Sequence, residues 1–371
     1  MKMEKIRAVI IGFAHMHVNE IAQYINEQED FELVGMADVP PEVPEATTAR
    51  YTRAWNLKNN SERYHITPHD DFREMLDELK PDIAFILCEN NRKPQIVLEC
   101  AKRGVNVSIE KPMATTLDQA LEIKKTVESY GIEAMVNWPV IWRPYIHKEL
   151  AALDSGIVGR LVKSFYINGH TGPLGKGAKH RGVTEKAQEM TDEERASTWW
   201  YQNHTGGGAF LDIGCYGCFF NTWARRDDDV PLMVSASAGN YNTPYMDAPD
   251  NVAGIIEYKD SLGIYEGTWT VPQASLPTGP IYSCTDGVLY CTPDKEIKAM
   301  NLYGEEIELP EYEIPAHIAN IVDHYAYCRR NHLQLLKTVT LDYNIRVMAL
   351  LDASIKSAKS GKKEAIRHDF R

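Results

Sequence analysis

The chain has 371 residues, with 40 Lys and Arg against 52 Asp and Glu, and a formal net charge of −12. This length predicts two domains. The composition, 44% hydrophobic and 25% charged, is typical of a folded globular chain and excludes general disorder. The acidic balance argues against a nucleic-acid binder, because phosphate neutralisation needs a dense Lys and Arg surface. No apolar run approaches the roughly 20 residues that span a bilayer, so no membrane segment is expected.

The seven cysteines are odd in number and scattered along the chain. This distribution favours free thiols in a reducing compartment, and we expect a cytoplasmic protein without disulfides. Cys215 and Cys218 form a Cys-x-x-Cys pair, but neither a second pair nor a nearby histidine couple completes a zinc site. We therefore expect no metal, and we expect these two cysteines to be small buried residues.

The first 136 residues alternate between strand and helix signals. Apolar runs predict strands at 6–11, 31–39, 81–88 and 105–109, and helical periodicity appears at 15–28, 72–79 and 96–101. Apolar strands that alternate with helices form a parallel sheet covered on both faces. The sequence therefore predicts an α/β fold whose N-terminal domain, residues 1–136, is a Rossmann-type doubly wound sheet.

The pattern changes after residue 136. Runs rich in β-branched and aromatic residues, joined by Gly, Pro, Asn and Asp turns, occur at 161–167, 232–238, 252–258 and 261–271. They predict a C-terminal α+β domain, residues 137–371, with a large, mostly antiparallel open sheet. The segment 341–359 is expected to be a helix and is a candidate to pack back on the first domain. The polar segment 171–195 is expected to be a long mobile loop.

The first turn of the chain reads Gly-Phe-Ala-His-Met-His over residues 12–17, between a strand and a helix. This is the context of a dinucleotide-binding turn. Only the first glycine of the Gly-x-Gly-x-x-Gly fingerprint is present, because Ala14 and His17 take the other two places. Two interpretations of His15 stay open: a polar side chain at a helix start, or a contact to cofactor phosphates at the positive helix end.

Asp38 ends the second predicted strand. An acidic side chain there accepts hydrogen bonds from the adenosine ribose and repels a 2′-phosphate, which favours NAD over NADP. An ordinary aspartate in a strand-end turn is the alternative interpretation.

Residues 110–112, Glu-Lys-Pro, follow the predicted strand at 105–109, and three further motifs follow in order. These are Ser-Gly-Ile-Val-Gly at 155–159, Gly-Gly-Gly-Ala-Phe-Leu-Asp-Ile-Gly-Cys-Tyr at 206–216, and Ser-Ala-Lys-Ser-Gly-Lys at 357–362. The ordered set resembles the glucose–fructose oxidoreductase / inositol dehydrogenase (Gfo/Idh/MocA) family over almost the whole chain. The resemblance implies an NAD-dependent oxidoreductase whose second domain binds substrate and forms oligomers. It implies cofactor contacts by Gly12, Phe13, Ala14, His15, Met16, Asp38, Cys88, Glu89, Asn90, Glu110 and Lys111.

Two departures from the family pattern concern the substrate. The family's Pro-Asn-x-x-His is Glu-Asn-Asn-Arg-Lys at 89–93, and Tyr216 stands where most members have a catalytic histidine. The glucose–fructose oxidoreductase branch also has a tyrosine at that position.

Lys111, Asp212 and Tyr216 are the candidate catalytic residues. Asp212 and Tyr216 are four residues apart and share one face of a helix. Tyrosine titrates near pH 10, too high for a base at neutrality. By the resemblance Lys111 points into the cleft, where its ammonium would lower the pKa of Tyr216 and so assist it as the acid/base. Without the resemblance, Tyr216 is a half-buried aromatic residue and Lys111 a solvated turn lysine.

The substrate is expected to contact these three residues and two more, Trp138 and His170. Aromatic faces with polar neighbours stack on sugar rings, although a tryptophan in the sheet core is the alternative interpretation. The function predicted is hydride transfer between NAD and a ring hydroxyl of a sugar, cyclitol or glycoside.

Two other functions stay open. One is an NAD-retaining enzyme that cleaves glycosides through transient sugar oxidation and elimination. The other is a non-catalytic NAD-binding regulator. Because an exposed sheet invites aggregation unless it is covered, we also expect a homo-oligomer, a dimer or tetramer, formed through the second-domain sheet.

Overall fold

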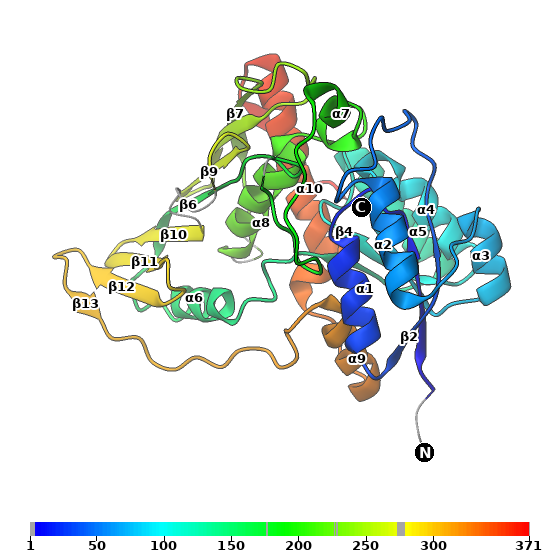
Figure 1. Ribbon diagram of the computed structural model, residues 1–371. Coiled ribbons are helices and arrows are strands. Elements are labelled where there is room, and N and C mark those ends of the chain that lie inside the picture. Colours follow the sequence, from blue (N-terminus) through cyan, green and yellow to red (C-terminus); the bar gives the residue numbers. More distant parts are fainter. Residues whose placement is uncertain (1–3, 176, 226, 228, 273–278, 371) are drawn as a thin grey trace.

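The computed structural model describes residues 4–175, 177–225, 227, 229–272 and 279–370. Figure 1 shows an N-terminal half in blue and cyan beside a second, open sheet in green and yellow. The N-terminal sheet is fully parallel, with strand order β2-β1-β3-β4-β5. Its strands are β1 (Ile6–Ile11), β2 (Phe31–Ala37), β3 (Ile83–Ile86), β4 (Asn106–Glu110) and β5 (Ala134–Asn137). The order confirms the predicted Rossmann-type half.

Five helices accompany this sheet: α1 (Val18–Glu27), α2 (Arg53–Tyr64), α3 (Phe72–Leu79), α4 (Lys93–Ala101) and α5 (Leu117–Tyr130). Apolar periodicity did not predict α2, because the residues that it buries are polar, namely Arg53, Asn56 and Asn60. Asn56 accepts a 2.9 Å hydrogen bond from Asn19 on α1. Polar packing of this kind leaves no apolar signal in the sequence.

The second sheet has nine strands in the order β13-β12-β11-β10-β6-β9-β8-β7-β14. Strands β6 and β9 are parallel and the other pairs are antiparallel, which confirms the predicted mostly antiparallel sheet. Its strands are β6 (Leu161–Gly169), β7 (Met233–Gly239), β8 (Asn251–Glu257), β9 (Leu262–Thr268), β10 (Gly279–Cys284), β11 (Gly287–Cys291), β12 (Ile297–Asn301), β13 (Glu306–Ile307) and β14 (Glu364–Ala365).

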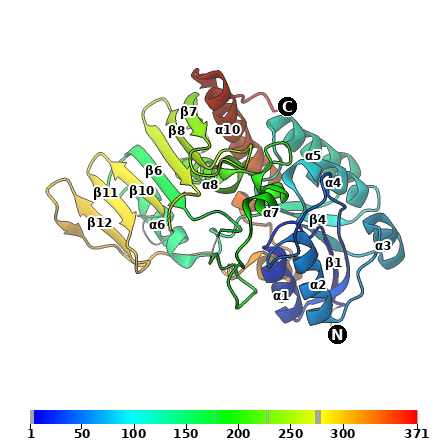
Figure 2. The ribbon, with the colours of Figure 1, turned by 45° about the horizontal axis from the view of Figure 1, so that its top comes forward.

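The two faces of this sheet differ. Helices α6 (Pro144–Asp154), α8 (Cys215–Trp223) and α10 (Leu341–Ser360) pack on one face (Figure 2). On the other face, the strand register aligns Ile281, Phe165, Ile264 and Ile255 in one row across four strands. Ile255 is 49% exposed. An apolar row of this kind on an exposed face indicates a surface that another protein molecule covers.

The C-terminal helices connect the two sheets. Helix α10 contacts α5 of the first domain as well as α8 and β7 of the second, and it ends at Gly361 in the left-handed region (φ 67°). Helix α9 (Ile321–Asn331) lies on α1, where Gln28 donates a 3.1 Å hydrogen bond to Asp323. Within the described part of the chain, we find no helix whose length and apolar character would let it cross a membrane.

Candidate active site

A cavity of about 670 Å³ lies between the two sheets. One wall comes from the first turn of the Rossmann half, with His15, Met16 and His17, and the other comes from the second domain. Lys111, directly after β4, also lines it. Because the carboxyl ends of parallel strands form the usual ligand crevice of an open α/β sheet, this cavity is the candidate active site.

The first turn is packed tightly against the end of β3. Gly12 has φ 88°, and a Cβ there would lie 2.7 Å from the backbone nitrogen of Cys88, so this position requires glycine. The backbone N–H of Phe13 donates to Asp38 (2.8 Å) and that of His15 donates to the carbonyl of Leu87 (3.0 Å). The N–H groups that would cradle a phosphate are therefore already partly satisfied within the protein.

The second domain covers this turn. Trp199 Nε1 donates a 2.9 Å hydrogen bond to the carbonyl of Ala14, and Trp200 packs edge-on against His15 with ring centroids 4.7 Å apart. Phe13, Ala14 and Cys88 are all buried. Of the expected cofactor residues, His15, Met16 and Lys111 reach the cavity surface.

Among the remaining expected cofactor residues, Asp38 and Glu89 pair with Arg53, and Asn90 joins the domains. Arg53 Nη1 lies 2.8 Å from Asp38 Oδ1 and also pairs with Glu89. Asn90 Nδ2 donates to the carbonyl of Gly206 (2.8 Å), which fixes the first domain to the glycine segment of the second. A ribose at Asp38 would therefore share this carboxylate with Arg53, a residue that the sequence pattern did not indicate.

Lys111, Asp212 and Tyr216 meet at the cavity wall. Lys111 Nζ donates to the carbonyl oxygen of Asp212 (2.8 Å) and to its Oδ1 (3.1 Å), and it lies 4.5 Å from the centroid of the Tyr216 ring. A π-helical turn, Phe210–Gly214, precedes α8 and carries Asp212. Wide turns of this kind are frequent at functional sites.

The charges of this cluster are strongly coupled. Burial acts to raise the pKa of Asp212, but Lys111 and His170 outweigh it and hold that pKa well below its usual value. Burial acts to lower the pKa of Lys111, but Tyr216 and Asp212 raise it instead. Lys111 and Asp212 thus form a charged pair at neutral pH.

Tyr216 differs from the expectation. Burial raises the pKa of its phenol above the usual value, and Lys111 offsets only part of this rise. Lys111 thus acts to lower the pKa, as expected, but burial outweighs it, so the net shift is upward. Tyr216 is a protonated phenol at neutral pH.

His170 lies on the far side of the Asp212 carboxylate. Its Nε2 lies 3.1 Å from Asp212 Oδ2, and Trp269 Nε1 donates to the same oxygen at 2.9 Å. His170 Nδ1 is buried and has no hydrogen-bond partner among the described residues. The carboxylate of Asp212 thus holds Lys111 through one oxygen and His170 and Trp269 through the other.

Trp138 lies in the core and not at the cavity surface. It is 1% exposed, and its Nε1 donates to Asn344 on α10 (2.7 Å). Its ring packs edge-on against Tyr216, with centroids 5.5 Å apart. The expected substrate contact by Trp138 is thus replaced by a packing role, because α10 covers the indole.

The segment 171–195 is anchored on the first domain and borders the cavity. Tyr51 donates to the carbonyl of Glu185 (2.5 Å) and Arg63 to that of Gly182 (2.8 Å). The cavity surface includes His180 from this segment and Arg143. Neither was a predicted site residue, since no local motif marks either of them. In its described part, the expected loop lies against the first domain through these hydrogen bonds.

Cys215 and Cys218 lie on α8 and are buried, as expected. Burial raises the pKa of the Cys215 thiol to about 12. All seven cysteines are free. A protonated, buried thiol is not a nucleophile.

The fold and the cavity define a two-domain protein built on a Rossmann half. Residues 6–138 match the GFO_IDH_MocA family model, described as "Oxidoreductase family, NAD-binding Rossmann fold". The match confirms the predicted resemblance: residues 6–138 are an NAD-binding Rossmann domain of this oxidoreductase family.

Curated relatives align at low identity. A dTDP-3,4-didehydro-2,6-dideoxy-alpha-D-glucose 3-reductase of Actinomadura kijaniata is 25% identical over 171 residues, covering 46% of this chain and 45% of that protein. A protein of Akkermansia muciniphila, named "Glycosyl hydrolase family 109 protein 1", is 24% identical over 248 residues, covering 64% of this chain and 46% of that protein. The chain spans about half the length of each of these two relatives.

Solved structures match over nearly the whole chain. The WlbA dehydrogenase of Bordetella pertussis, in complex with NADH and UDP-GlcNAcA, superposes with a TM-score of 0.74 at 18% identity, covering 99% of this chain and 100% of that one. This similarity confirms the fold class, a parallel N-terminal sheet followed by a larger, mostly antiparallel sheet.

Proposed function

We propose that the chain is an NAD-dependent oxidoreductase that transfers a hydride between nicotinamide and a ring hydroxyl of a sugar, cyclitol or glycoside. One observation carries this proposal: Lys111, Asp212 and Tyr216 lie together on the wall of a cavity whose opposite wall is the first turn of an NAD-binding Rossmann domain. The sugar reductase among the relatives and the sugar nucleotide in the WlbA complex support a sugar-like substrate.

NAD, when bound, supplies the hydride acceptor or donor. The chain's own residues are proposed to hold it at the first turn, through Gly12, Phe13, Ala14, His15 and Met16, and along the strand ends, through Asp38, Cys88, Glu89, Asn90, Glu110 and Lys111. The cavity fits the nicotinamide end, because His15, Met16 and Lys111 line it.

The reacting oxygen of the substrate is proposed to contact Lys111 and Tyr216. The Lys111 ammonium stabilises negative charge on this oxygen, and Asp212 holds the ammonium in place. Because burial keeps Tyr216 protonated, the phenol is set to donate its proton when a ketone is reduced. In the opposite direction Tyr216 receives the hydroxyl proton only if the bound ligands first favour the phenolate.

His170 is a second candidate for the proton acceptor. A histidine oriented by a carboxylate is the usual arrangement of a general base, and His170 Nε2 lies 3.1 Å from Asp212. His170 also lines the cavity. The same residue can bind substrate without moving a proton, so variants of both Tyr216 and His170 are needed to separate the roles.

A second candidate function is glycoside cleavage with retention of NAD. The glycosyl hydrolase name of the Akkermansia relative favours it, as does the segment 171–195, which offers a polar border for a bulky aglycone. Hydride removal from a sugar hydroxyl carbon acidifies the neighbouring C–H bond. Loss of that proton then expels the aglycone, water adds, and the hydride returns, so the cofactor shows no net change.

A third candidate is a non-catalytic NAD-binding regulator. The cluster of Lys111, Asp212 and Tyr216 argues against it, because a sensor has no need of buried acid/base groups. The seven free thiols support the proposed cytoplasmic location, and the net charge of −12 opposes a nucleic-acid partner.

One experiment separates these functions. The purified chain is denatured and any released nucleotide is identified, before and after incubation with NAD and a panel of polyols and glycosides. Net NADH with a ketone product supports the dehydrogenase, and sugar release without net NADH supports cleavage. Tight NAD binding without turnover across the panel supports the regulator. A chain that does not bind NAD or NADP under any of these conditions overturns the proposal.

A further inference from the structure

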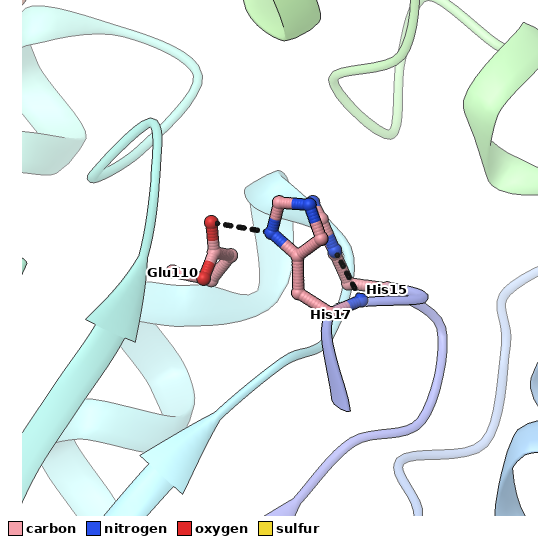
Figure 3. Close-up of side chains that lie close together, drawn as sticks. All are labelled: His15, His17 and Glu110. Carbon is pink, nitrogen blue, oxygen red and sulfur yellow. Dashed lines mark hydrogen bonds and ion pairs between the residues drawn. The ribbon is translucent and has the colours of Figure 1, made fainter. Parts of the chain in front are cut away.

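Four metal-ligating side chains gather where the first turn meets the end of β4. His15 and His17 come from the turn, Glu110 from the last residue of β4, and Glu20 from the first helical turn of α1. A ring nitrogen of each histidine and an oxygen of Glu110 all lie within 4.8 Å of one another. Figure 3 shows both imidazoles beside the Glu110 carboxylate.

His17 is the centre of this cluster. Its Nδ1 lies 3.1 Å from Glu110 Oε1 and 3.8 Å from Glu20 Oε1. His15 is held beside it, because the backbone N–H of His17 donates to His15 Nδ1 at 3.1 Å. Two carboxylate oxygens thus converge on a single imidazole nitrogen, at separations that one metal ion can bridge.

The second oxygen of each carboxylate is held by another side chain. Asn137 Nδ2 donates to Glu110 Oε2 at 2.8 Å, and Tyr24 donates to Glu20 Oε2 at 3.3 Å. These bonds leave the Oε1 atoms of both carboxylates facing His17. In protein metal sites, the ligating side chains are usually held in orientation by hydrogen bonds from neighbouring residues.

The carboxylates of the cluster are buried and pair with one histidine. Glu20 and Glu110 are 4% and 2% exposed, and His17 is an ion-pair partner of both. The positive charge of Arg181 acts to lower the pKa of Glu20, and the charge of Lys111 acts to lower the pKa of both histidines. The oxygens of these two buried carboxylates face one imidazole and are suited to bind a divalent ion.

We propose that His15, His17, Glu20 and Glu110 bind one divalent transition-metal ion at the cavity wall. Imidazole and carboxylate ligands together suit Zn²⁺ and the similar ions Co²⁺ and Mn²⁺. His15, His17 and Glu20 line the same cavity as Lys111 and Asp212, so the ion faces the proposed substrate position.

The sequence motif gave no sign of this site. The turn supplies two histidines that are separated by one residue, but Glu110 lies 93 positions after His17. The expectation that no metal is bound rested on the Cys215 and Cys218 pair, which lies elsewhere on α8. The site shares His15 and Glu110 with the proposed cofactor contacts, so metal binding and NAD binding are measured separately.

The test uses the full chain after chelator treatment and dialysis. Co²⁺ is titrated with detection of its visible d–d absorption, and Zn²⁺ content is measured by mass spectrometry after desalting. We expect one ion per chain and a Co²⁺ spectrum of nitrogen and oxygen ligands. His17→Ala and Glu110→Gln should abolish binding, and Asn137→Ala should weaken it by about 10–100-fold, as loss of an outer hydrogen bond does.

His204→Ala is the matched control, because His204 is an exposed histidine outside the cluster, and its variant should bind like the parent. Circular dichroism checks that each variant is folded. If His17→Ala does not fold, Glu110→Gln alone provides the test of metal binding. Absence of bound Co²⁺ and Zn²⁺ would overturn the proposal. Equal binding by the parent and Glu110→Gln, or the intense charge-transfer bands of thiolate ligands, would overturn it as well.

Discussion

His170 Nε2 lies 3.1 Å from Asp212 Oδ2, while the other oxygen of the same carboxylate accepts a hydrogen bond from Lys111. Asp212 therefore positions two potential substrate contacts from different elements, one after β4 and one at the end of β6. Its low pKa keeps the carboxylate charged across the physiological range. The cluster centres on Asp212 more than on Tyr216, which the family pattern makes the obvious catalytic position.

The roles of Tyr216 and His170 can be separated by their variants. If Tyr216 is the acid/base, Tyr216→Phe should lower kcat on the true substrate by about 10²–10⁴-fold with NAD affinity nearly unchanged. His170→Asn should then change mainly KM. Steady-state kinetics with both variants is the measurement. Full turnover by Tyr216→Phe would assign the proton transfer away from Tyr216.

Asp212→Asn should destabilise the protein as well as reduce activity. The substitution leaves the buried Lys111 ammonium without its ionic partner, and we expect the free energy of unfolding to fall by about 2–4 kcal/mol. Urea titration checks this value. The matched control is Asp192→Asn, because Asp192 pairs with Arg195 at the exposed surface and should change the free energy of unfolding by less than about 1 kcal/mol. Equal effects of the two variants would contradict a buried ion pair.

Gly12→Ala should disturb the first turn. An alanine there would adopt φ 88° and place its Cβ 2.7 Å from the backbone of Cys88, so we expect a loss of about 2–3 kcal/mol. Gly131→Ala has a similar φ of 68° without any atom within 4 Å of the added Cβ, and it should lose about 1 kcal/mol. Thermal unfolding of the two variants gives the comparison, and similar melting temperatures would show that the turn is not packed on β3.

Glu45 should make stability depend on pH. Burial raises its pKa to about 7 in the folded chain, against a usual value of 4.5, with Arg53 offsetting part of the rise. The folded state therefore holds the proton more tightly, and the free energy of unfolding should fall by about 1–3 kcal/mol as pH rises from 4.5 to 7. Glu45→Gln should remove this decline. Urea titrations at several pH values test it, and parallel pH profiles of the variant and parent would contradict it.

The open face of the second sheet should form the subunit interface. The row of Ile281, Phe165, Ile264 and Ile255 provides an apolar surface, and we expect a dimer or tetramer at micromolar concentration. Ile255→Asp should shift sedimentation toward the monomer. Tyr303→Asp is the control, since Tyr303 is 91% exposed and lies at the β12–β13 turn, away from this row. A monomeric parent would refute the interface.

The sequence by itself predicted most of the elements around the site and the candidate residues Lys111, Asp212 and Tyr216. Apolar strands alternating with helices define the Rossmann half, because each strand needs cover on both faces. The motifs at 110–112 and 206–216 brought Lys111, Asp212 and Tyr216 together, since helix spacing and family order are properties of the chain itself.

The tertiary structure determined the pKa shifts of the site residues and which distant residues contact one another. Lys111 acts to lower the pKa of Tyr216, but burial, which sequence spacing does not encode, raises it overall. The burial of Trp138 under α10 and the cover of the first turn by Trp199 both join residues about 185 positions or more apart. His17 and Glu110 likewise meet only because β1 and β4 end at the same edge of one parallel sheet.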